Sequence, residues 1–201
     1  MVDRAAVLKL RRARIGTGSA SATVDRSAGA LQVLGTPRLV NVAGQVVRDD
    51  QGNPIPVSVY FTSLNDEELG GDSNTSVSTT PQAGEWGGLS FRNDIDRALN
   101  RFDWEQEGIF LNYVNQADIR YGGGTVIVAS VSQTINPIHA TDARPTITYN
   151  TITNSADAAM SANPDSFQED SFHGPQYQSV PFTSDYMRVG PDVHGNRLMD
   201  N

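Results

Sequence analysis

The sequence has no cysteine and only one lysine, Lys9, among its 201 residues. The absence of cysteine excludes disulfides, thiolate metal sites and a cysteine nucleophile. A formal net charge of −8 argues against nucleic acid as a main partner, because binding phosphates requires a basic surface. No apolar run reaches the roughly 18 residues that a membrane span needs. Charged residues also interrupt residues 1–15, where a signal peptide would be apolar, so we expect neither feature within this chain.

Helical periodicity is scarce as well. Residues 93–107 have a helix-like composition without a long apolar stripe, and residues 156–160 are expected to form a short helical turn. Short segments rich in Val, Ile, Thr and aromatic residues predominate instead. They are residues 7–10, 30–34, 57–62, 86–91, 109–114, 118–121, 125–131, 146–153 and 196–199. Turns containing Gly and Asn separate them, which excludes a doubly wound α/β fold and leaves a sandwich, a barrel or a β-solenoid.

Recurrence along the chain favours the solenoid. Residues 111–121, 146–157 and 194–201 resemble one another, and their starts are roughly 35 to 50 residues apart, as in repeat folds with inserted loops. Asparagine recurs at segment ends: Asn112, Asn115, Asn150, Asn154, Asn196 and Asn201. It tolerates left-handed backbone angles at corners, and stacked Asn side chains can hydrogen-bond from rung to rung. The alternative is that Asn is simply frequent in turns.

These patterns predict one domain over residues 1–201 with an all-β fold, a right-handed parallel β-helix without substantial helices. Aromatic residues make up only 7% of the chain, so we expect a core of Val, Ile, Leu and Ala. Three polar segments, residues 38–56, 65–84 and 167–185, are expected to be loops inserted between rungs.

Several segments also resemble a known class of protein. Residues 59–66 (Val-Tyr-Phe-Thr-Ser-Leu-Asn-Asp) and 81–91 (Pro-Gln-Ala-Gly-Glu-Trp-Gly-Gly-Leu-Ser-Phe) are similar to paired segments in right-handed parallel β-helix proteins of large bacterial surface or secreted polypeptides. Residues 118–124, 135–147 and 189–196 are similar to other rungs of those proteins. The resemblance covers most of the chain from about Ala30 onward. The resemblance implies that residues 59–66 end one rung and residues 86–91 open the next. It is moderately specific for the fold and poorly specific for the function.

A calcium site is one hypothesis for the acidic loop. Asp66, Asp72 and Asn74 offer hard oxygen ligands at short spacing in a segment that contains glycine. The spacing of an EF-hand and the repeat of a calcium β-roll are both absent. The alternative is a solvated acidic loop, and the chain is not expected to require any cofactor.

A catalytic site is a second hypothesis. Polysaccharide lyases and hydrolases built on β-helices need Asp residues with a basic residue on one outer face. Asp118, Arg120, Asp142 and Arg144 supply those types if the rungs align them, and His139 lies nearby in the sequence. The alternative for Asp142 and Arg144 is an ion pair across a turn. Trp86, beside Gly87 and Gly88, is expected to pack within a rung.

We expect a non-catalytic structural or interaction protein of the cell surface or extracellular matrix. The last strand-like segment and the first, residues 7–10, leave strand edges that something must cover. Further rungs of a longer polypeptide or another copy of the chain stacked head to tail would cover them, and stacking would produce filaments. The alternatives are a polysaccharide-active β-helix enzyme and a carbohydrate-binding adhesin.

Overall fold

The fold was taken from a computed structural model. The structure describes residues 2–3, 6–18, 30–37, 41–43, 45–52, 58–73, 75–92, 112–167 and 190–201. Residues 93–107, expected to be a loop with at most one helical turn, lie outside these residues, as does nearly all of the expected loop 167–185. Every statement of absence below refers to the described residues.

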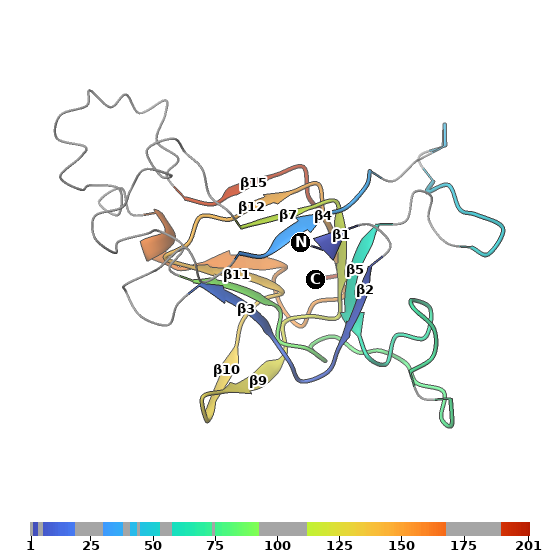
Figure 1. The fold of residues 1–201 in the computed structure, drawn as a ribbon, viewed down its shortest axis with the longest axis horizontal. Helices are drawn as coiled ribbons and strands as arrows, with labels where there is room; N and C mark the ends of the chain where they lie inside the picture. The colour runs from blue at the N-terminus through green and yellow to red at the C-terminus, as the bar shows by residue number, and fades with distance from the viewer. Residues whose placement is uncertain are drawn as a thin grey trace.

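Three parallel sheets surround the core (Figure 1). Sheet A contains β1 (Val2–Asp3), β4 (Gln32–Leu34), β7 (Tyr113–Asn115), β12 (Thr146–Thr148) and β15 (Asp192–His194). Sheet B contains β2 (Val7–Leu10), β5 (Val59–Ser63), β8 (Ala117–Arg120), β13 (Thr151–Thr153) and β16 (Arg197–Met199). Sheet C contains β3 (Ile15–Gly18), β6 (Leu89–Arg92), β11 (Ile138–Thr141) and β14 (Met160–Ala162).

The chain visits the sheets in the order A, B, C and then begins the next turn, which makes a β-helix-like solenoid. The predicted all-β solenoid is therefore confirmed. The three similar segments also align as predicted: Thr146 pairs with Tyr113 on one side and Asp192 on the other, and Ile152 pairs with Ile119 and Leu198. One detail differs from the resemblance, because 59–66 and 86–91 belong to the same rung, in sheets B and C.

The core consists of apolar columns that run from rung to rung. In sheet A, Val33, Val114 and Ile147 are in register, and all three are buried. In sheet B the column includes Phe61, Ile119 and Ile152, and in sheet C it includes Ile15, Leu89 and Ile138. Alternate strand residues point to opposite faces, so these columns face inward and their neighbours face outward. Burying each large side chain contributes roughly 1.5–3 kcal/mol.

Asparagine side chains hold the corners between sheets A and B. Asn150 is fully buried; its Oδ1 accepts a hydrogen bond from the Ala117 N–H at 2.9 Å. Its Nδ2 donates to the carbonyl of Val114 and to Oδ1 of Asn196, each at 2.9 Å. The next rung repeats the pattern, since Asn196 Nδ2 donates to the Ile147 carbonyl at 2.7 Å. The predicted contact between stacked asparagines is confirmed at this corner.

Two local predictions need correction. Residues 125–131 are not one strand: β9 (Thr125–Val128) and β10 (Val131–Thr134) form an antiparallel hairpin that projects from the solenoid (Figure 1). Ala129 and Ser130 both have positive φ, which turns the chain between them. Arg14 secures the hairpin through a 2.8 Å hydrogen bond to Gln133.

The expected helical turn at 156–160 is also wrong, since bends lead there into strand β14. A single 3₁₀ helix, η3 (Pro164–Phe167), follows that strand, and no helix in the described part of the chain is long and apolar enough to cross a membrane. Trp86 is buried as expected, and its indole N–H donates to the Arg120 carbonyl at 2.7 Å.

Replacing Asn150 with Ala tests the corner. The change leaves the Ala117 N–H and the Val114 carbonyl without their side-chain partner, so we expect the free energy of unfolding to fall by about 2–4 kcal/mol. The matched control is Asn115→Ala, which loses a hydrogen bond to the Thr148 hydroxyl but no contact with a buried backbone group. We expect that control to cost about 1 kcal/mol or less in chemical denaturation. Equal losses in both variants would contradict this role of Asn150.

Candidate functional site

The last rung leaves the apolar core open to solvent. Val193 and Leu198 occupy the inward columns next to Ile147 and Ile152, yet they are 47% and 50% exposed. Ile147 and Ile152, one rung earlier, are almost completely buried. The difference arises because no described strand pairs with the outer edge of β15 or β16.

A cavity of about 280 Å³ opens between the ends of sheets A and C. Its walls are mainly apolar and include Ile138, Ile147, Met160, Phe167 and Val193. Four of these residues belong to the sheets, and Phe167 ends the 3₁₀ helix that follows β14. The end of the solenoid therefore presents an apolar recess together with the free edges of β14, β15 and β16.

A polar cluster covers the outer face of sheet B two rungs away. Asp118 and Arg120 flank the inward residue Ile119, so both face outward. Arg120 Nε lies 3.1 Å from Asp118 Oδ1, and Arg120 Nη2 lies 3.0 Å from Oδ2, which makes a bidentate ion pair. Asp118 is only 1% exposed. Arg120 also lies over the Tyr60 ring, with its Cζ 6.0 Å from the ring centroid.

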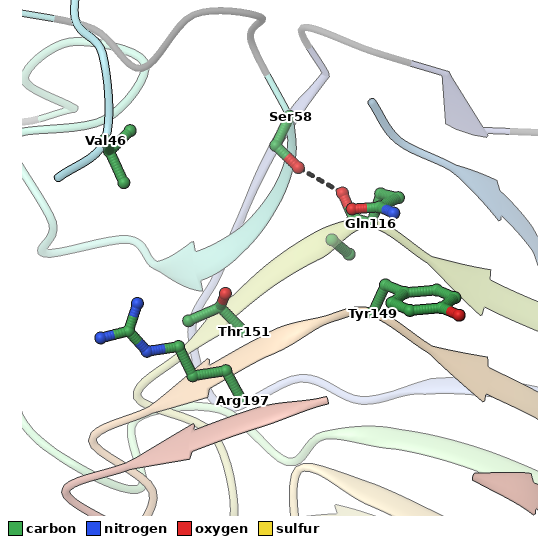
Figure 2. A pocket seen from close by; sticks show the side chains of 7 residues that line it. Val46, Ser58, Gln116, Tyr149, Thr151 and Arg197 are labelled. Atoms are coloured by element: carbon green, nitrogen blue, oxygen red, sulfur yellow. Dashed lines mark hydrogen bonds between the residues drawn. The ribbon is translucent and has the colours of Figure 1, made fainter. Parts of the chain in front are cut away.

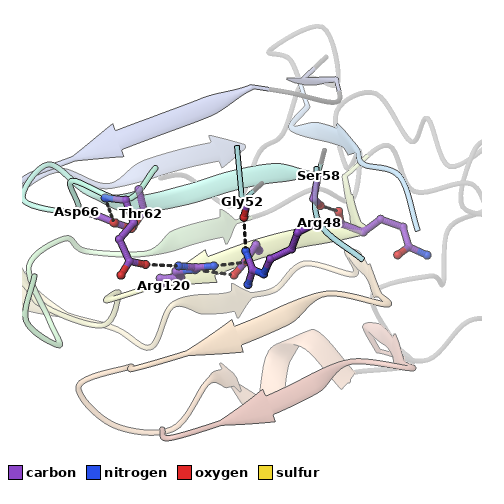
Figure 3. Close-up of polar contacts among 9 residues, drawn as sticks. Arg48, Gly52, Ser58, Thr62, Asp66 and Arg120 are labelled. Carbon is purple, nitrogen blue, oxygen red and sulfur yellow. Dashed lines mark hydrogen bonds and ion pairs between the residues drawn. The ribbon is translucent and has the colours of Figure 1, made fainter. Parts of the chain in front are cut away.

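Asp66 brings the acidic loop onto this cluster (Figure 3). Its carboxylate accepts hydrogen bonds from the Thr62 hydroxyl and from the Glu68 N–H. Burial alone would lower the pKa of Arg120, but the hydrogen bond and charge of Asp118, with the charge of Asp66, outweigh it and raise that pKa. Burial and the negative charge of Asp66 raise the pKa of Tyr121. Arg120 thus stays charged near the buried carboxylates of Asp118 and Asp66, and its attraction to both stabilises the contact between the acidic loop and sheet B.

The four residues of the catalytic hypothesis lie at two places. Asp118 and Arg120 meet on sheet B, whereas Asp142 and Arg144 lie on the turn from β11 to β12, between sheets C and A. Asp142 has a φ of 47°, and its N–H donates to Asn163 Oδ1 at 3.0 Å. Arg144 is completely buried. The register therefore places one pair within strand β8 and the other on a turn between sheets C and A, and catalysis stays a prediction.

The residues of the calcium hypothesis are only partly described. Asp66 is buried with its carboxylate engaged within its own loop, and Asp72 is exposed. Asn74 lies outside the described residues. No group of three or more His, Asp or Glu side chains in the described part of the chain is arranged to hold a metal ion. Calcium binding stays a prediction.

His139 faces outward from sheet C and contacts hydroxyl groups. Its Nδ1 lies 2.8 Å from Ser161 Oγ, and its Nε2 lies 3.1 Å from Thr141 Oγ1. Burial lowers the pKa of His139, and the positive charge of Arg14 lowers it further. The imidazole is therefore neutral at neutral pH and joins β11 to β14.

Sequence reasoning missed a polar cleft at the junction of sheets A and B (Figure 2). Ser58, Gln116, Tyr149, Thr151 and Arg197 line it, and its volume is about 170 Å³. The relevant signal lay within 146–153, where Tyr149 and Asn150 form a corner in the middle of what was expected to be one strand. Once those two residues are assigned to a corner, Thr151 and Arg197 fall in register beside it.

Arg120→Met tests the polar cluster. The substitution removes the cation between Asp118 and Asp66 while keeping a long side chain, so we expect a loss of about 3 kcal/mol in the free energy of unfolding. The control is Arg48→Met, because Arg48 is a loop residue whose guanidinium donates to the Gly52 carbonyl at an exposed position. We expect that change to cost less than about 1 kcal/mol. Similar values for the two variants would show that Arg120 does not hold the cluster together.

The lowered pKa of His139 predicts a pH dependence of stability. Below its ordinary value of 6.5 the unfolded chain binds more protons at this residue than the folded chain, so the free energy of unfolding falls as pH falls. We expect His139→Gln to reduce this slope between about pH 7 and about pH 5 in urea unfolding. An unchanged slope in His139→Gln would refute the assignment.

Comparison of the sequence with protein-family models and curated proteins, and of the structure with solved structures, finds no match. The assignment to a β-helix-like solenoid therefore rests on the sheet topology and register described above.

Proposed function

We propose that this chain is a structural and interaction module whose last rung is a docking surface for another β-solenoid unit. The observation that carries the proposal is the exposure of Val193 and Leu198 at core positions. Two half-exposed apolar residues beside an apolar recess lose stabilisation that a further rung would supply. No strand of the described residues pairs with the outer edges of β14, β15 and β16, and such edges favour pairing with another strand.

The occupant we favour is a second copy of the chain, stacked head to tail. Continuing the register of sheet B beyond the last rung places Leu8 of the next copy on Leu198. Both residues lie in the inward column of sheet B, so this apolar column would continue across the junction. Sheet C has four described strands against five in sheet B, so the same stacking leaves one rung open between Met160 and Ile15 of the next copy. The same register sets Lys9 and Arg11 of the next copy close to Asp200, which adds opposite charges outside the core.

Repeated head-to-tail contacts of this kind do not close a ring, so they produce linear assemblies. This mode of assembly suits a component of a cell surface or extracellular matrix. That setting agrees with the resemblance of residues 59–66 and 81–91 to large bacterial surface or secreted polypeptides. A non-catalytic role is also consistent with the bidentate pairing of the buried Asp118 with the partly exposed Arg120, in which each group engages the other.

Leu198→Asp tests this function. A carboxylate in the inward column would have to be buried in the junction, so we expect association to weaken by at least about tenfold. Ile127→Asp is the matched control, because Ile127 is 78% exposed on the projecting hairpin and not at the end of the solenoid. Sedimentation velocity over a range of concentrations measures the association, and circular dichroism verifies that both variants are folded.

Negative-stain microscopy distinguishes whether a second copy of the chain or a further rung of one longer polypeptide covers the last rung. Head-to-tail stacking predicts linear particles of uniform width in the wild type and their loss in Leu198→Asp. Amorphous aggregates that Leu198→Asp suppresses would favour a further rung of one longer polypeptide as the natural occupant. A wild-type protein that stays monomeric at every concentration would refute both.

A further inference from the structure

The polar cleft at the junction of sheets A and B has the features of a ligand site. It lies on the outer face of the solenoid and is open to solvent (Figure 2). The volume of about 170 Å³ is below the roughly 300–1,000 Å³ of sites for drug-sized ligands. It therefore suits one ring-sized group of a ligand that extends beyond the cleft.

Tyr149 supplies an aromatic surface in a constrained position. Its φ of 56° lies in the left-handed region, which is uncommon for a bulky residue. The ring is 52% exposed, yet its position is restricted from two sides. A Cβ on Gly195 would approach the ring to 2.5 Å, so only glycine lets the ring lie there. His194 contacts the ring edge-on, with 5.3 Å between the ring centroids.

Arg197 supplies a cation on the same cleft. It occupies the outward column of sheet B next to Thr151, and it is exposed. Among the described residues no side-chain partner engages its guanidinium, in contrast to Arg120, which Asp118 binds, and Arg48, which bonds the Gly52 carbonyl. On a chain with a net charge of −8, an exposed guanidinium that no described side chain engages is a local site for an anionic group.

Hydrogen-bonding groups complete the lining. Thr151 offers a hydroxyl between Arg197 and Tyr149, and Gln116 offers an amide near the Tyr149 ring (Figure 2). The hydroxyl of Ser58 donates to the backbone carbonyl of Gln116, which ties the preceding rung to this corner. The cleft thus combines a flat apolar surface, neutral polar groups and one cation.

We propose that this cleft binds a carboxylate-bearing sugar, such as a uronic acid residue of a glycan. The apolar face of a sugar ring can lie on Tyr149, its hydroxyls match Thr151 and Gln116, and its carboxylate matches the Arg197 guanidinium. This ligand site is distinct from the docking surface proposed above. Thr151 and Arg197 lie on an outward column and Tyr149 lies at the corner beside it, so the cleft faces away from the inward columns that the docking surface would cover.

The test uses two disaccharides that differ only in the charged group. Cellobiouronic acid carries a carboxylate where cellobiose carries a hydroxymethyl group. Titration at low ionic strength, followed by saturation-transfer NMR, measures binding of each to the wild-type protein. We expect cellobiouronic acid to bind at least about tenfold more tightly than cellobiose. Absence of binding by cellobiouronic acid, or equal binding of the two sugars, would overturn the proposal.

Two variants locate the binding. Arg197→Gln removes the cation and is expected to abolish the preference for cellobiouronic acid, whereas Arg11→Gln makes the same change of charge outside the cleft and is expected to preserve it. Tyr149→Asn removes the ring at a residue type that tolerates the left-handed corner, and it is expected to weaken binding of both sugars. Equal effects of Arg197→Gln and Arg11→Gln would show non-specific attraction and overturn the site.

Sedimentation velocity of the same variants measures association, so the test of the sugar site can be distinguished from the test of head-to-tail assembly. Arg197→Gln is expected to associate like the wild type while it loses the sugar preference. Loss of the preference with normal association supports the site whether or not the protein forms filaments. Circular dichroism verifies the fold, and a misfolded Arg197→Gln variant leaves Tyr149→Asn to decide the outcome.

Discussion

The in-register stacking of side chains from rung to rung is the interaction on which this structure depends. Each inward residue contacts the equivalent residue one turn away, so Phe61, Ile119 and Ile152 form a continuous column in sheet B. A shift of one residue in any strand would move its apolar side chains to the outer face. The register also explains the end of the molecule, because the last residue of each column is covered on one side only.

The corners between strands adopt backbone angles that are energetically unfavourable for most residues. Turning from one short strand to the next within one or two residues uses left-handed backbone angles at Gln116 and Tyr149, and Asn154 and Asp200 adopt the same angles directly after β13 and β16. Such angles are unfavourable for most side chains, and hydrogen bonds from side chains to neighbouring rungs offset part of that cost. Asn150 contributes three such hydrogen bonds, two to backbone groups of the preceding rung and one to the side chain of Asn196 in the next rung.

The sequence predicted the repeating parts of the fold better than the irregular ones. Asn and β-branched residues indicated that segments 111–121, 146–157 and 194–201 are similar rungs, and the strand pairing places their strands next to one another. Residues 146–153 were expected to be one strand because Tyr149 has a high strand propensity, which the corner overrides. The hairpin at 125–134 was missed because two strands joined by Ala129 and Ser130 lack the usual Asn-Gly signal.

Contacts between distant segments explain why the surface sites were harder to predict. Strand alternation places Asp118 and Arg120 on the outer face of sheet B. The other charges near Arg120, those of Asp66 and Glu68, come from a loop more than 50 residues earlier in the chain. No local pattern specifies which outer positions a loop will cover.

The outward columns show how inserted loops divide one sheet face into different environments. Tyr60, Asp118, Thr151 and Arg197 occupy successive positions of one column of sheet B. The first two are buried, Thr151 is half-buried, and Arg197 is exposed. Charges at the covered positions must be paired, as Asp118 is with Arg120, because an unpaired buried charge is strongly destabilising. Arg197 at the uncovered end is free of that requirement, so this part of the column can hold a group for a ligand without loss of stability.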